Sequence, residues 1–225
     1  RVIFISQGYF LNQKARDLYR LPENITIKYC PNPIDIDDNF DLKSLQKKNK
    51  IIFLGRIESV KRGWLFCEIA ERMPEFYVLG QTFREKKENS AVMQKYLSIP
   101  NLHFSGHVDG IEKEKYLMEA KILVNTSIHE ALPISFLEAL SYGTLLVSNR
   151  NPENLTEKFG IYVGEVLGDG FDKVDLYTQA IRTLIENEQL RVKKAEAAIN
   201  YVKQVHNVPD FIKTIREIIY NEANL

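Results

Sequence analysis

The chain of 225 residues has few cysteines and no long hydrophobic run. Its two cysteines, Cys30 and Cys67, are too few for a disulfide framework and favour a reducing compartment. The longest apolar runs span five or six residues, whereas a membrane-spanning helix needs about 20. The sequence shows no charged segment followed by an apolar one, as a signal peptide has, and so gives no support for secretion. These absences predict a cytoplasmic protein.

The chain also lacks an excess of charge of either sign. Thirty Lys and Arg residues balance thirty Asp and Glu residues, so the formal net charge is zero. No overall positive field therefore attracts nucleic acid or an acidic membrane surface. Hydrophobic residues make up 44% of the chain, which is enough to bury a core and excludes a disordered tail or a fibre. We expect a globular protein that binds no nucleic acid.

From residue 50 onward, short apolar runs alternate with longer amphipathic stretches. This alternation predicts an α/β fold, a Rossmann-like doubly wound parallel sheet covered by helices on both faces. In such a sheet, ligands bind beyond the carboxyl ends of the strands. The predicted strands are 51–54, 76–79, 102–104, 122–124, 145–147 and 161–163. Helical spacing is found at 64–70, 111–120 and 134–142, a polar stretch at 84–96, and a helical C-terminal segment at 176–185, 190–205 and 211–220.

The first 50 residues follow a different pattern. Residues 2–5 and 25–29 are predicted strands, and the first begins as though its parent sheet continued outside the chain. The second ends in Pro31-Asn32-Pro33, a turn with little conformational freedom. Residues 35–49 are polar and include several lysines, and we interpret them as a solvated linker rather than an anion-binding site.

The first candidate site follows the predicted strand 51–54. Gly55 lets the backbone approach a ligand closely, and Arg56 and Lys61 lie beside a helix that opens at Gly63. Two cations beside a helix start suit a diphosphate. The same spacing also fits ordinary surface residues on a loop between strand and helix. No G-x-G-x-x-G occurs in the chain, so this is not a dinucleotide fingerprint.

The second candidate site is the segment 129–138, with the sequence HEALPISFLE. Pro133 suits a first helical turn, because its missing N–H costs nothing there. The N–H groups of Ile134, Ser135 and Phe136 are then expected to be free and to favour an anion.

Two glutamates of this segment have different surroundings. Glu130 precedes the predicted helix and is able to point into a cleft. Glu138 lies on the helix among apolar neighbours, and buried carboxylates are uncommon unless they are paired or used. We therefore expect Glu138 to accept from paired hydroxyls, such as those of a ribose or a sugar ring. A metal site has no support, because H-E-x-x-H fails at Pro133 and no Cys/His cluster has ligand spacing.

The two sites form one pattern. Residues 51–61 (IIFLGRIESVK), FSGHV at 104–108 and NTSIHEALPISFLEALSYGTLLVS at 125–148 resemble, in this order, the group 1 glycosyltransferases, also called glycosyltransferase family 4. The resemblance runs from about residue 28 to residue 205. Its strongest part is the ordered set with the Glu-x7-Glu spacing from Glu130 to Glu138. The family has a two-domain fold known as GT-B, of which this chain would supply the C-terminal half.

The resemblance implies a domain organisation. Residues 1–49 would be a remnant of the N-terminal domain together with the interdomain linker. Residues 50–205 would form the donor-binding Rossmann-like domain, and residues 206–225 a helix that crosses back to the missing domain. We expect the surface left open by that domain to let the fragment dimerise.

The resemblance also implies roles for the matching residues. Arg56 and Lys61 would hold the donor diphosphate and neutralise the charge of the departing nucleotide. Glu130 would lie against the transferred sugar, and Glu138 would bind the ribose hydroxyls. Further contacts with the nucleotide sugar are expected from Gly55, His107, Val108, Leu132, Pro133, Ile134 and Ser135.

The implied activity is transfer of a sugar, with retention and without a metal or other cofactor, from a UDP- or GDP-linked donor. The acceptor would be a glycan, a lipid-linked molecule or a small molecule bound by the missing domain, so the isolated chain is expected to transfer poorly. The full-length protein would lie in the cytoplasm, with a peripheral position at the inner membrane face left open.

Family members often carry glycines after the first glutamate, whereas this chain has Ala131, Leu132 and Pro133. This difference changes the room around the donor sugar, so the resemblance does not identify that sugar. Two alternative functions also remain: a non-catalytic nucleotide-sugar-binding or scaffold module, and a nucleotide-sugar epimerase of the same fold.

Overall fold

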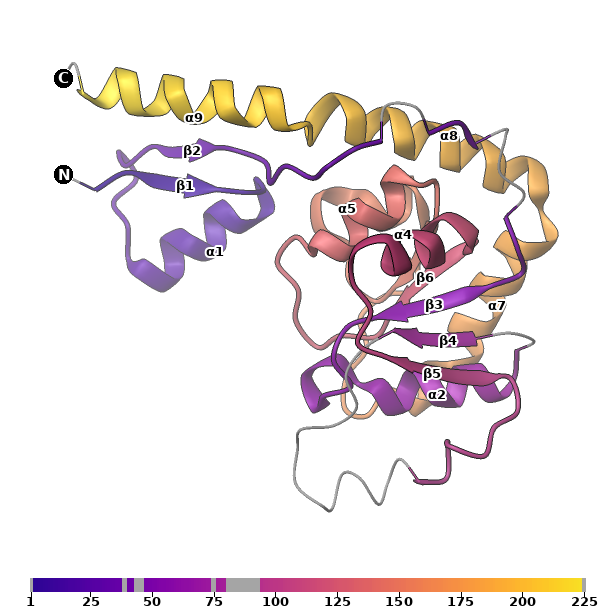
Figure 1. Ribbon diagram of the computed structural model, residues 1–225. Coiled ribbons are helices and arrows are strands. Elements are labelled where there is room, and N and C mark those ends of the chain that lie inside the picture. The colour runs from indigo at the N-terminus through magenta and orange to yellow at the C-terminus, as the bar shows by residue number, and fades with distance from the viewer. Residues whose placement is uncertain (1, 38–39, 43–46, 74–75, 80–93, 224–225) are drawn as a thin grey trace.

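Six parallel strands form the central sheet in a computed structural model that describes residues 2–37, 40–42, 47–73, 76–79 and 94–223 (Figure 1). The strands are β3 (Ile51–Leu54), β4 (Phe76–Leu79), β5 (Leu102–Gly106), β6 (Ile122–Asn125), β7 (Leu145–Ser148) and β8 (Gly160–Tyr162). Their order in the sheet is β5-β4-β3-β6-β7-β8. Numbered within this sheet, that is the order 3-2-1-4-5-6 of a Rossmann fold. The predicted fold class is confirmed.

Helices cover both faces of this sheet, because its central strands are apolar on both sides. Every residue of β6 and β7 is buried, as expected for inner strands of a parallel sheet. In β3, Ile51 and Phe53 belong to the core on one face and Ile52 to the core on the other. The first core includes α2 (Gly63–Glu71) and α7 (Val174–Glu186); the second includes α4 (Gly110–Glu119), α5 (Ile134–Ser141), α6 (Leu155–Lys158) and α8 (Glu188–Val205).

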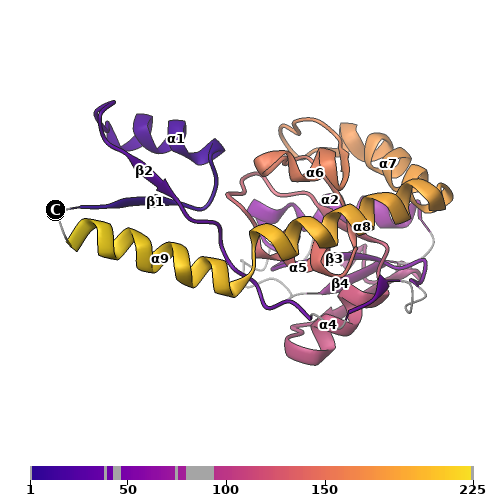
Figure 2. The ribbon, with the colours of Figure 1, turned by 90° about the horizontal axis from the view of Figure 1, so that it is seen from above.

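A smaller unit precedes the sheet in the sequence. It consists of β1 (Phe4–Ser6), α1 (Phe10–Tyr19) and β2 (Ile27–Tyr29), and its two strands pair in parallel. The long helix α9 (Val208–Ala223) runs from the large domain alongside this unit, and both ends of the chain lie there (Figures 1 and 2). Both strands were predicted, although β1 begins at Phe4 rather than at Val2. The helix α1 was not predicted, although Leu11, Ala15 and Leu18 have helical spacing and line one cavity; none of its residues is buried.

The junction between the small unit and the large domain is held by a few specific hydrogen bonds. His206, which follows α8, accepts at its carbonyl from the Ile34 N–H at 2.9 Å, and its Nδ1 lies 2.7 Å from the Asn32 carbonyl. Glu153 of the large domain accepts from the N–H of Phe10, the first residue of α1, at 2.9 Å. The small unit is therefore tied to the large domain at the Asn32–Ile34 turn and at the start of α1.

The interpretation of residues 35–49 as a solvated linker is wrong for Lys47. Its ammonium group donates to the carbonyls of Leu117, Met118 and Ala120 and to Thr144 Oγ1, over distances of 2.7–3.3 Å. These carbonyls end α4, where the last turn has no partners within the helix and where the dipole favours a cation. Burial lowers the pKa of Lys47 well below its ordinary value. The sequence shows only that residue 47 is a cation. The carbonyls that surround its ammonium group lie 70 or more positions away, so the sequence does not locate them.

Some predicted features fall outside the described residues, namely Lys43 of this segment and residues 84–93 of the polar stretch. Among the helices that the structure describes, none combines the length and the apolar composition needed to cross a bilayer.

Candidate functional site

A cavity of about 640 Å³ opens at the carboxyl ends of β3 and β6. These neighbouring strands mark the point where the strand order reverses, because β3 leads to β4 on one side and β6 leads to β7 on the other. Crevices at such a switch point are the usual ligand sites of open α/β sheets. The cavity is lined by Leu54, Gly55, Arg56, Lys61, His107, Val108, Asp109, Lys113, Glu130, Pro133, Ile134, Ser135 and Glu138. The two candidate sites of the sequence are therefore one site.

Lys61 and Glu130 form an ion pair in this cavity, with Nζ 2.6 Å from Oε1. The side chain of Glu130 is 10% exposed, so its carboxylate needs compensation for lost hydration. Asn125, the last residue of β6, supplies a second bond from Nδ2 to the same oxygen at 3.1 Å. Sequence reasoning missed Asn125, although a polar residue at the end of a buried apolar strand is a usable signal.

The backbone that carries Lys61 is fixed by a buried neighbour, Arg62. This residue is 2% exposed and has a left-handed φ of 46°. Its guanidinium donates to the carbonyls of Val166 and Gly168, both at 2.9 Å, and to that of Thr126 at 3.3 Å. The Thr126 hydroxyl in turn donates to the Lys61 carbonyl at 2.7 Å. Arg62 was not predicted, because in the sequence it is one more cation beside Lys61.

Arg56 follows Gly55 at the end of β3. Gly55 has a φ of 151°, a region that is essentially restricted to glycine. The Arg56 side chain is 63% exposed, and its Nη1 lies 3.0 Å from Glu58 Oε1. A surface pair of this kind is worth at most about 1 kcal/mol, so a phosphate can replace Glu58 as the partner of Arg56 at little cost.

The start of α5 supplies backbone donors to the cavity. Pro133 is the residue before the first helical turn, with φ −63° and ψ 128°, and Ile134 begins the helix. The expectation of three free N–H groups is wrong for Phe136, because its N–H donates to the Pro133 carbonyl at 3.0 Å. Ile134 and Ser135 line the cavity, and their N–H groups have no backbone partner among the described residues. They remain donors for an anion.

Glu138 is paired as well, with a lysine that the sequence did not predict. Lys113 Nζ, from the second turn of α4, lies 2.9 Å from Glu138 Oε1 and 3.3 Å from Asp109 Oδ1. Burial lowers the pKa of Lys113, but its bonds to Glu138 and Asp109 outweigh this and raise the pKa above its ordinary value. Lys113 therefore carries its full charge at neutral pH. No pattern in the sequence linked it to Glu138, which lies 25 positions later.

Two further predictions have different outcomes. His107 and Val108, in the loop between β5 and α4, do line the cavity. Leu132 does not: it is 4% exposed and belongs to the same hydrophobic core as Phe136 and Leu137. Its side chain anchors the loop between Glu130 and α5, because an apolar group that precedes a buried helix packs into the core.

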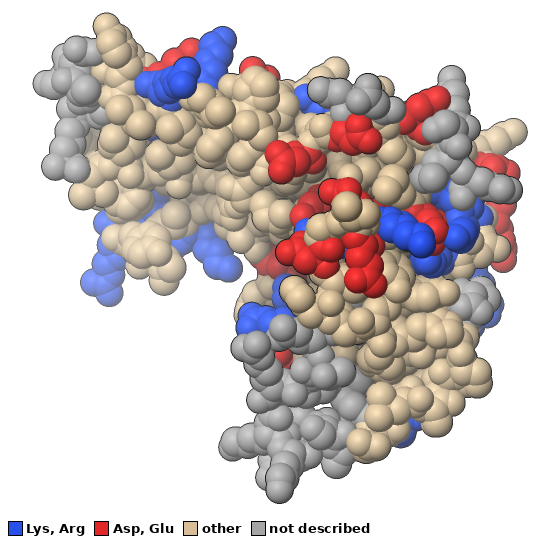
Figure 3. Space-filling model, in the orientation of Figure 1, with Lys and Arg blue, Asp and Glu red and all other residues tan. Residues whose placement is uncertain are grey.

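Charges in the cavity balance. The described lining residues include three cations, Arg56, Lys61 and Lys113, and three carboxylates, Asp109, Glu130 and Glu138. In the described ranges, no group of three or more His, Cys, Asp and Glu side chains is placed to hold a metal ion. Figure 3 shows acidic side chains gathered over α4 and α5 and basic ones beside the hollow that separates the small unit from the large domain.

The sheet order and the charged switch-point cavity define a ligand-binding domain of the doubly wound α/β class. Residues 35–205 match the family described as glycosyl transferases group 1. The match covers well over half of the chain, and the chain belongs to this family. A comparison with curated protein sequences gives no match.

Solved structures support the same fold. The chain is similar to the pneumococcal O-GlcNAc transferase GtfA, solved with UDP and GlcNAc (TM-score 0.76, 13% identity, 97% of this chain and 45% of that chain). It is also similar to sucrose-phosphate synthase from Thermosynechococcus elongatus, with a TM-score of 0.76 and 13% identity over 98% of this chain and 58% of that chain. A third similar structure is WaaG, a glycosyltransferase involved in lipopolysaccharide biosynthesis. Its TM-score is 0.69, with 16% identity over 94% of this chain and 61% of that chain. The architecture is that of GT-B glycosyltransferases, and this chain spans between 45% and 61% of these three chains.

Proposed function

We propose that the chain is the donor-binding half of a glycosyltransferase that uses a nucleotide-diphosphate sugar. One observation carries the proposal: the cavity at the switch point brings Arg56, Lys61 and the start of α5 together with two carboxylates. Family membership supports it, as does the presence of UDP in the structure of the similar O-GlcNAc transferase. The assignment to one half of the enzyme is supported by the partial coverage of the similar chains.

The diphosphate is assigned to the cationic side of the cavity. A departing nucleotide diphosphate gains negative charge as the bond to the sugar breaks, and preorganised positive charge stabilises it. Arg56, Lys61 and the N–H groups of Ile134 and Ser135, all at the cavity lining, supply that charge. No metal is needed for this step, and we propose metal-independent transfer.

Glu130 is assigned to the transferred sugar. Its carboxylate is held by Lys61 and Asn125 at the end of β6, and a carboxylate accepts hydrogen bonds from sugar hydroxyls. When the diphosphate occupies Lys61, Glu130 is released to these hydroxyls. We further propose retention at the anomeric carbon, in which an oxygen of the leaving diphosphate takes the proton of the incoming acceptor.

The acceptor is assigned to a second domain beyond the small unit formed by β1, α1 and β2. We propose a glycan, a lipid-linked molecule or a small molecule in that place, and a cytoplasmic enzyme in contact with the inner membrane face where the acceptor is a lipid. The isolated chain is then expected to bind its donor and to transfer poorly.

Calorimetric titration of the 225-residue chain with UDP, GDP and ADP tests the proposal. Selective binding is expected, and nucleotide at about a hundred times its dissociation constant adds about 2.7 kcal/mol of stability in a thermal melt. A folded chain that binds none of them contradicts the proposal. Sugar transfer by an enzyme with both domains excludes a scaffold module, and an assay without acceptor detects an epimerase.

A further inference from the structure

A buried network of hydrogen bonds lies behind the cavity and ends on Glu130. Asn125, the last residue of β6, is 7% exposed and is not among the residues that line the cavity. In the register of the sheet it lies opposite Ser148, the last residue of β7. Its Nδ2 lies 3.1 Å from Glu130 Oε1. Asn125 therefore contacts Glu130 from the side of the sheet, whereas a ligand contacts it from the cavity.

The side-chain amide of Asn125 uses all of its hydrogen-bonding capacity. Such an amide has two N–H donors and an oxygen that accepts twice. Nδ2 donates to Ser127 Oγ at 3.0 Å and to Glu130 Oε1 at 3.1 Å. Oδ1 accepts from the Ser127 N–H and from the Ser148 hydroxyl, both at 3.2 Å. A buried amide with four partners has no reason to move.

These partners also fix which end of the amide faces Glu130. The Ser127 N–H donates only, so it requires the oxygen of Asn125. Ser148 Oγ accepts from the Arg150 N–H at 2.9 Å, which leaves its own hydrogen for the same oxygen. If the amide were turned over, its NH₂ group would face these two donors and its oxygen would face the carboxylate. Nδ2 is therefore the atom directed at Glu130.

The main chain of this network is held as well. The Tyr177 hydroxyl, from α7, lies 3.0 Å from the Asn125 carbonyl oxygen. Ser127, Ser148 and Tyr177 are all 0% exposed. Lys61, the other partner of Glu130, is different, because its side chain is 27% exposed and lines the cavity. Of the two donors to Glu130 Oε1, Asn125 is thus the fixed one and Lys61 the one that is able to move.

This difference matters once a donor is bound, and here the inference rests on the proposed function. Lys61 then pairs with the diphosphate, and Glu130 receives the hydroxyls of the transferred sugar. Among the described residues, the only other donor to Glu130 Oε1 is Asn125, and Oε2 has no hydrogen-bond partner. A carboxylate that is 10% exposed needs such a donor, because few water molecules reach it.

We propose that Asn125 is a positioning residue, which holds Glu130 Oε1 in the donor-bound state so that Oε2 faces the sugar hydroxyls. Without this bond, the carboxylate is free to follow the ammonium group of Lys61 toward the diphosphate. Asn125 acts through Glu130 and does not touch the ligand. The loss of its amide should therefore affect recognition of the sugar and not that of the nucleotide.

A ratio of two dissociation constants isolates this effect. Calorimetry with the 225-residue chain compares UDP-glucose and UDP-N-acetylglucosamine with UDP, GDP-mannose with GDP, and ADP-glucose with ADP. The constant of the nucleotide sugar is divided by that of its nucleotide, for the pair that the wild-type chain binds most tightly. Contributions from the base, the ribose and the diphosphate are common to both members of a pair and cancel.

Two substitutions remove the bond to Glu130. Asn125→Asp keeps the shape of the side chain and the acceptor for Ser127 and Ser148, but places an oxygen against the carboxylate. Asn125→Leu removes the donor without adding charge. Both are expected to raise the ratio by about tenfold, because a hydrogen bond to a charged group is lost. Glu130→Gln, which removes the charge that receives the sugar hydroxyls, should raise it in the same direction.

Asn101→Asp is the matched control. Asn101 directly precedes β5, at the opposite edge of the sheet from the cavity, and its Nδ2 also donates to two acceptors, the carbonyls of Ala70 and Met73. The same exchange of an amide for a carboxylate is expected to lower stability in a thermal melt and to leave the ratio unchanged. The melt also shows that each Asn125 variant is folded.

Each outcome decides between the two proposals. A ratio that rises in Glu130→Gln but stays constant in both Asn125 variants overturns the inference and leaves the proposed function intact. Asn125 variants that bind nucleotide and nucleotide sugar more weakly by one common factor also overturn it, because Asn125 then only stabilises the fold. A constant ratio in Glu130→Gln contradicts the role of Glu130 and the inference with it. Binding of no nucleotide by the folded wild-type chain contradicts the proposed function itself.

Discussion

At the scale of residues, the cavity holds its two glutamates in the same way. Glu130 is bonded to Lys61 and Glu138 to Lys113, over 2.6 and 2.9 Å. A carboxylate that has lost most of its water is costly unless a cation or a hydrogen-bond donor replaces that water. The pairing also keeps each carboxylate at the cavity wall, where ligand hydroxyls reach it. Each lysine thus organises the glutamate with which it pairs.

Arg56→Ala is expected to weaken nucleotide binding by about ten- to a hundredfold. The reason is the loss of a charge-assisted contact worth about 1.5–3 kcal/mol. Arg56→Lys should also weaken binding, because the planar fork that matches a phosphate is lost. Titration calorimetry measures both, with Arg72→Ala as the control, since Arg72 directly follows α2 and pairs with Asp175 outside the cavity. Unaltered affinity would place the diphosphate elsewhere.

Glu130→Ala should separate turnover from binding. In an enzyme that contains both domains, we expect turnover to fall by about a hundredfold or more, the scale at which single preorganised groups contribute. Nucleotide affinity should not fall, because Glu130 is assigned to the sugar and its removal frees Lys61 for the diphosphate. Glu196→Ala, at an exposed position of α8, is the matched control. If steady-state kinetics gave wild-type turnover for Glu130→Ala, the proposed role of Glu130 would be contradicted.

At the scale of elements, α4 is anchored at both ends. Asp109 caps its first turn and Lys47 its last. Glu119, the final residue of α4, adds ion pairs with Lys48 at 2.8 Å and Lys50 at 2.6 Å. Because α4 carries Lys113, these contacts hold one wall of the cavity in place.

The Glu119 pairs predict a pH dependence of stability. Burial raises the pKa of Glu119, but bonds from Lys48 and Lys50 outweigh it and hold the pKa below its ordinary value of 4.5. The folded state then binds fewer protons than the unfolded state in acid. The contribution is present above pH 4.5 and is lost as the pH falls through the folded pKa.

Denaturant unfolding of wild type and Glu119→Gln from neutral pH down to about pH 3 checks this. The difference in free energy of unfolding should be constant at neutral pH and shrink in acid. Curves that stay parallel throughout would show that the two lysines do not stabilise the carboxylate.

The strands show which elements a sequence specifies. All six strands of the large sheet lie within two residues of their predicted positions, because a short apolar run followed by glycine or a polar residue is a local signal. The helix α1 was missed, although Leu11, Ala15 and Leu18 have the spacing of one helical face. Its place between β1 and β2 agrees with the crossover that two parallel strands require.

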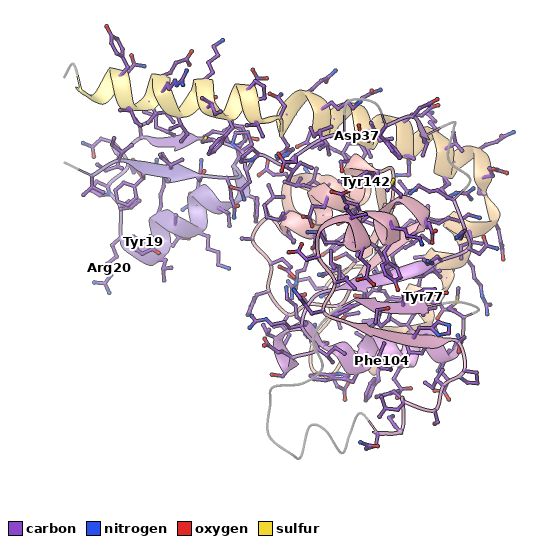
Figure 4. All side chains as sticks on the ribbon, in the orientation of Figure 1. Tyr19, Arg20, Asp37, Tyr77, Phe104 and Tyr142 are labelled. Carbon is purple, nitrogen blue, oxygen red and sulfur yellow. The ribbon has the colours of Figure 1, made fainter. Side chains whose placement is uncertain are left out.

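At the scale of the whole molecule, the small unit exposes much apolar surface. Ile5 and Leu18 of this unit are 47% and 70% exposed, and Tyr220 of the neighbouring α9 is 70% exposed. A cavity of about 600 Å³ lies between β1, α1 and α9. Figure 4 shows Tyr19 and Arg20 at the end of α1, pointing away from the large domain. Parallel sheets are normally covered on both faces, and this apolar surface is therefore available for a contact.

We predict that this surface makes the isolated chain dimerise. Sedimentation velocity at increasing concentration should show a dimer, and Leu18→Glu should weaken it, because a charge is costly in an apolar contact. Leu97→Glu, at a position of the large domain that is 55% exposed, is the matched control. A wild-type chain that remains monomeric at every concentration would contradict the prediction.

Local patterns in the sequence specify the fold class and include most of the residues that line the cavity. Apolar runs, helical spacing and the residues around Arg56, Lys61, Glu130 and Glu138 are local patterns, and each is written within about ten residues. The tertiary structure decided the partners. Lys61 lies 69 positions from Glu130, and Lys47 lies 70 or more from the carbonyls that it caps. Such pairs form because parallel strands bring distant loops to one edge of the sheet, and burial there makes any charge without a partner costly.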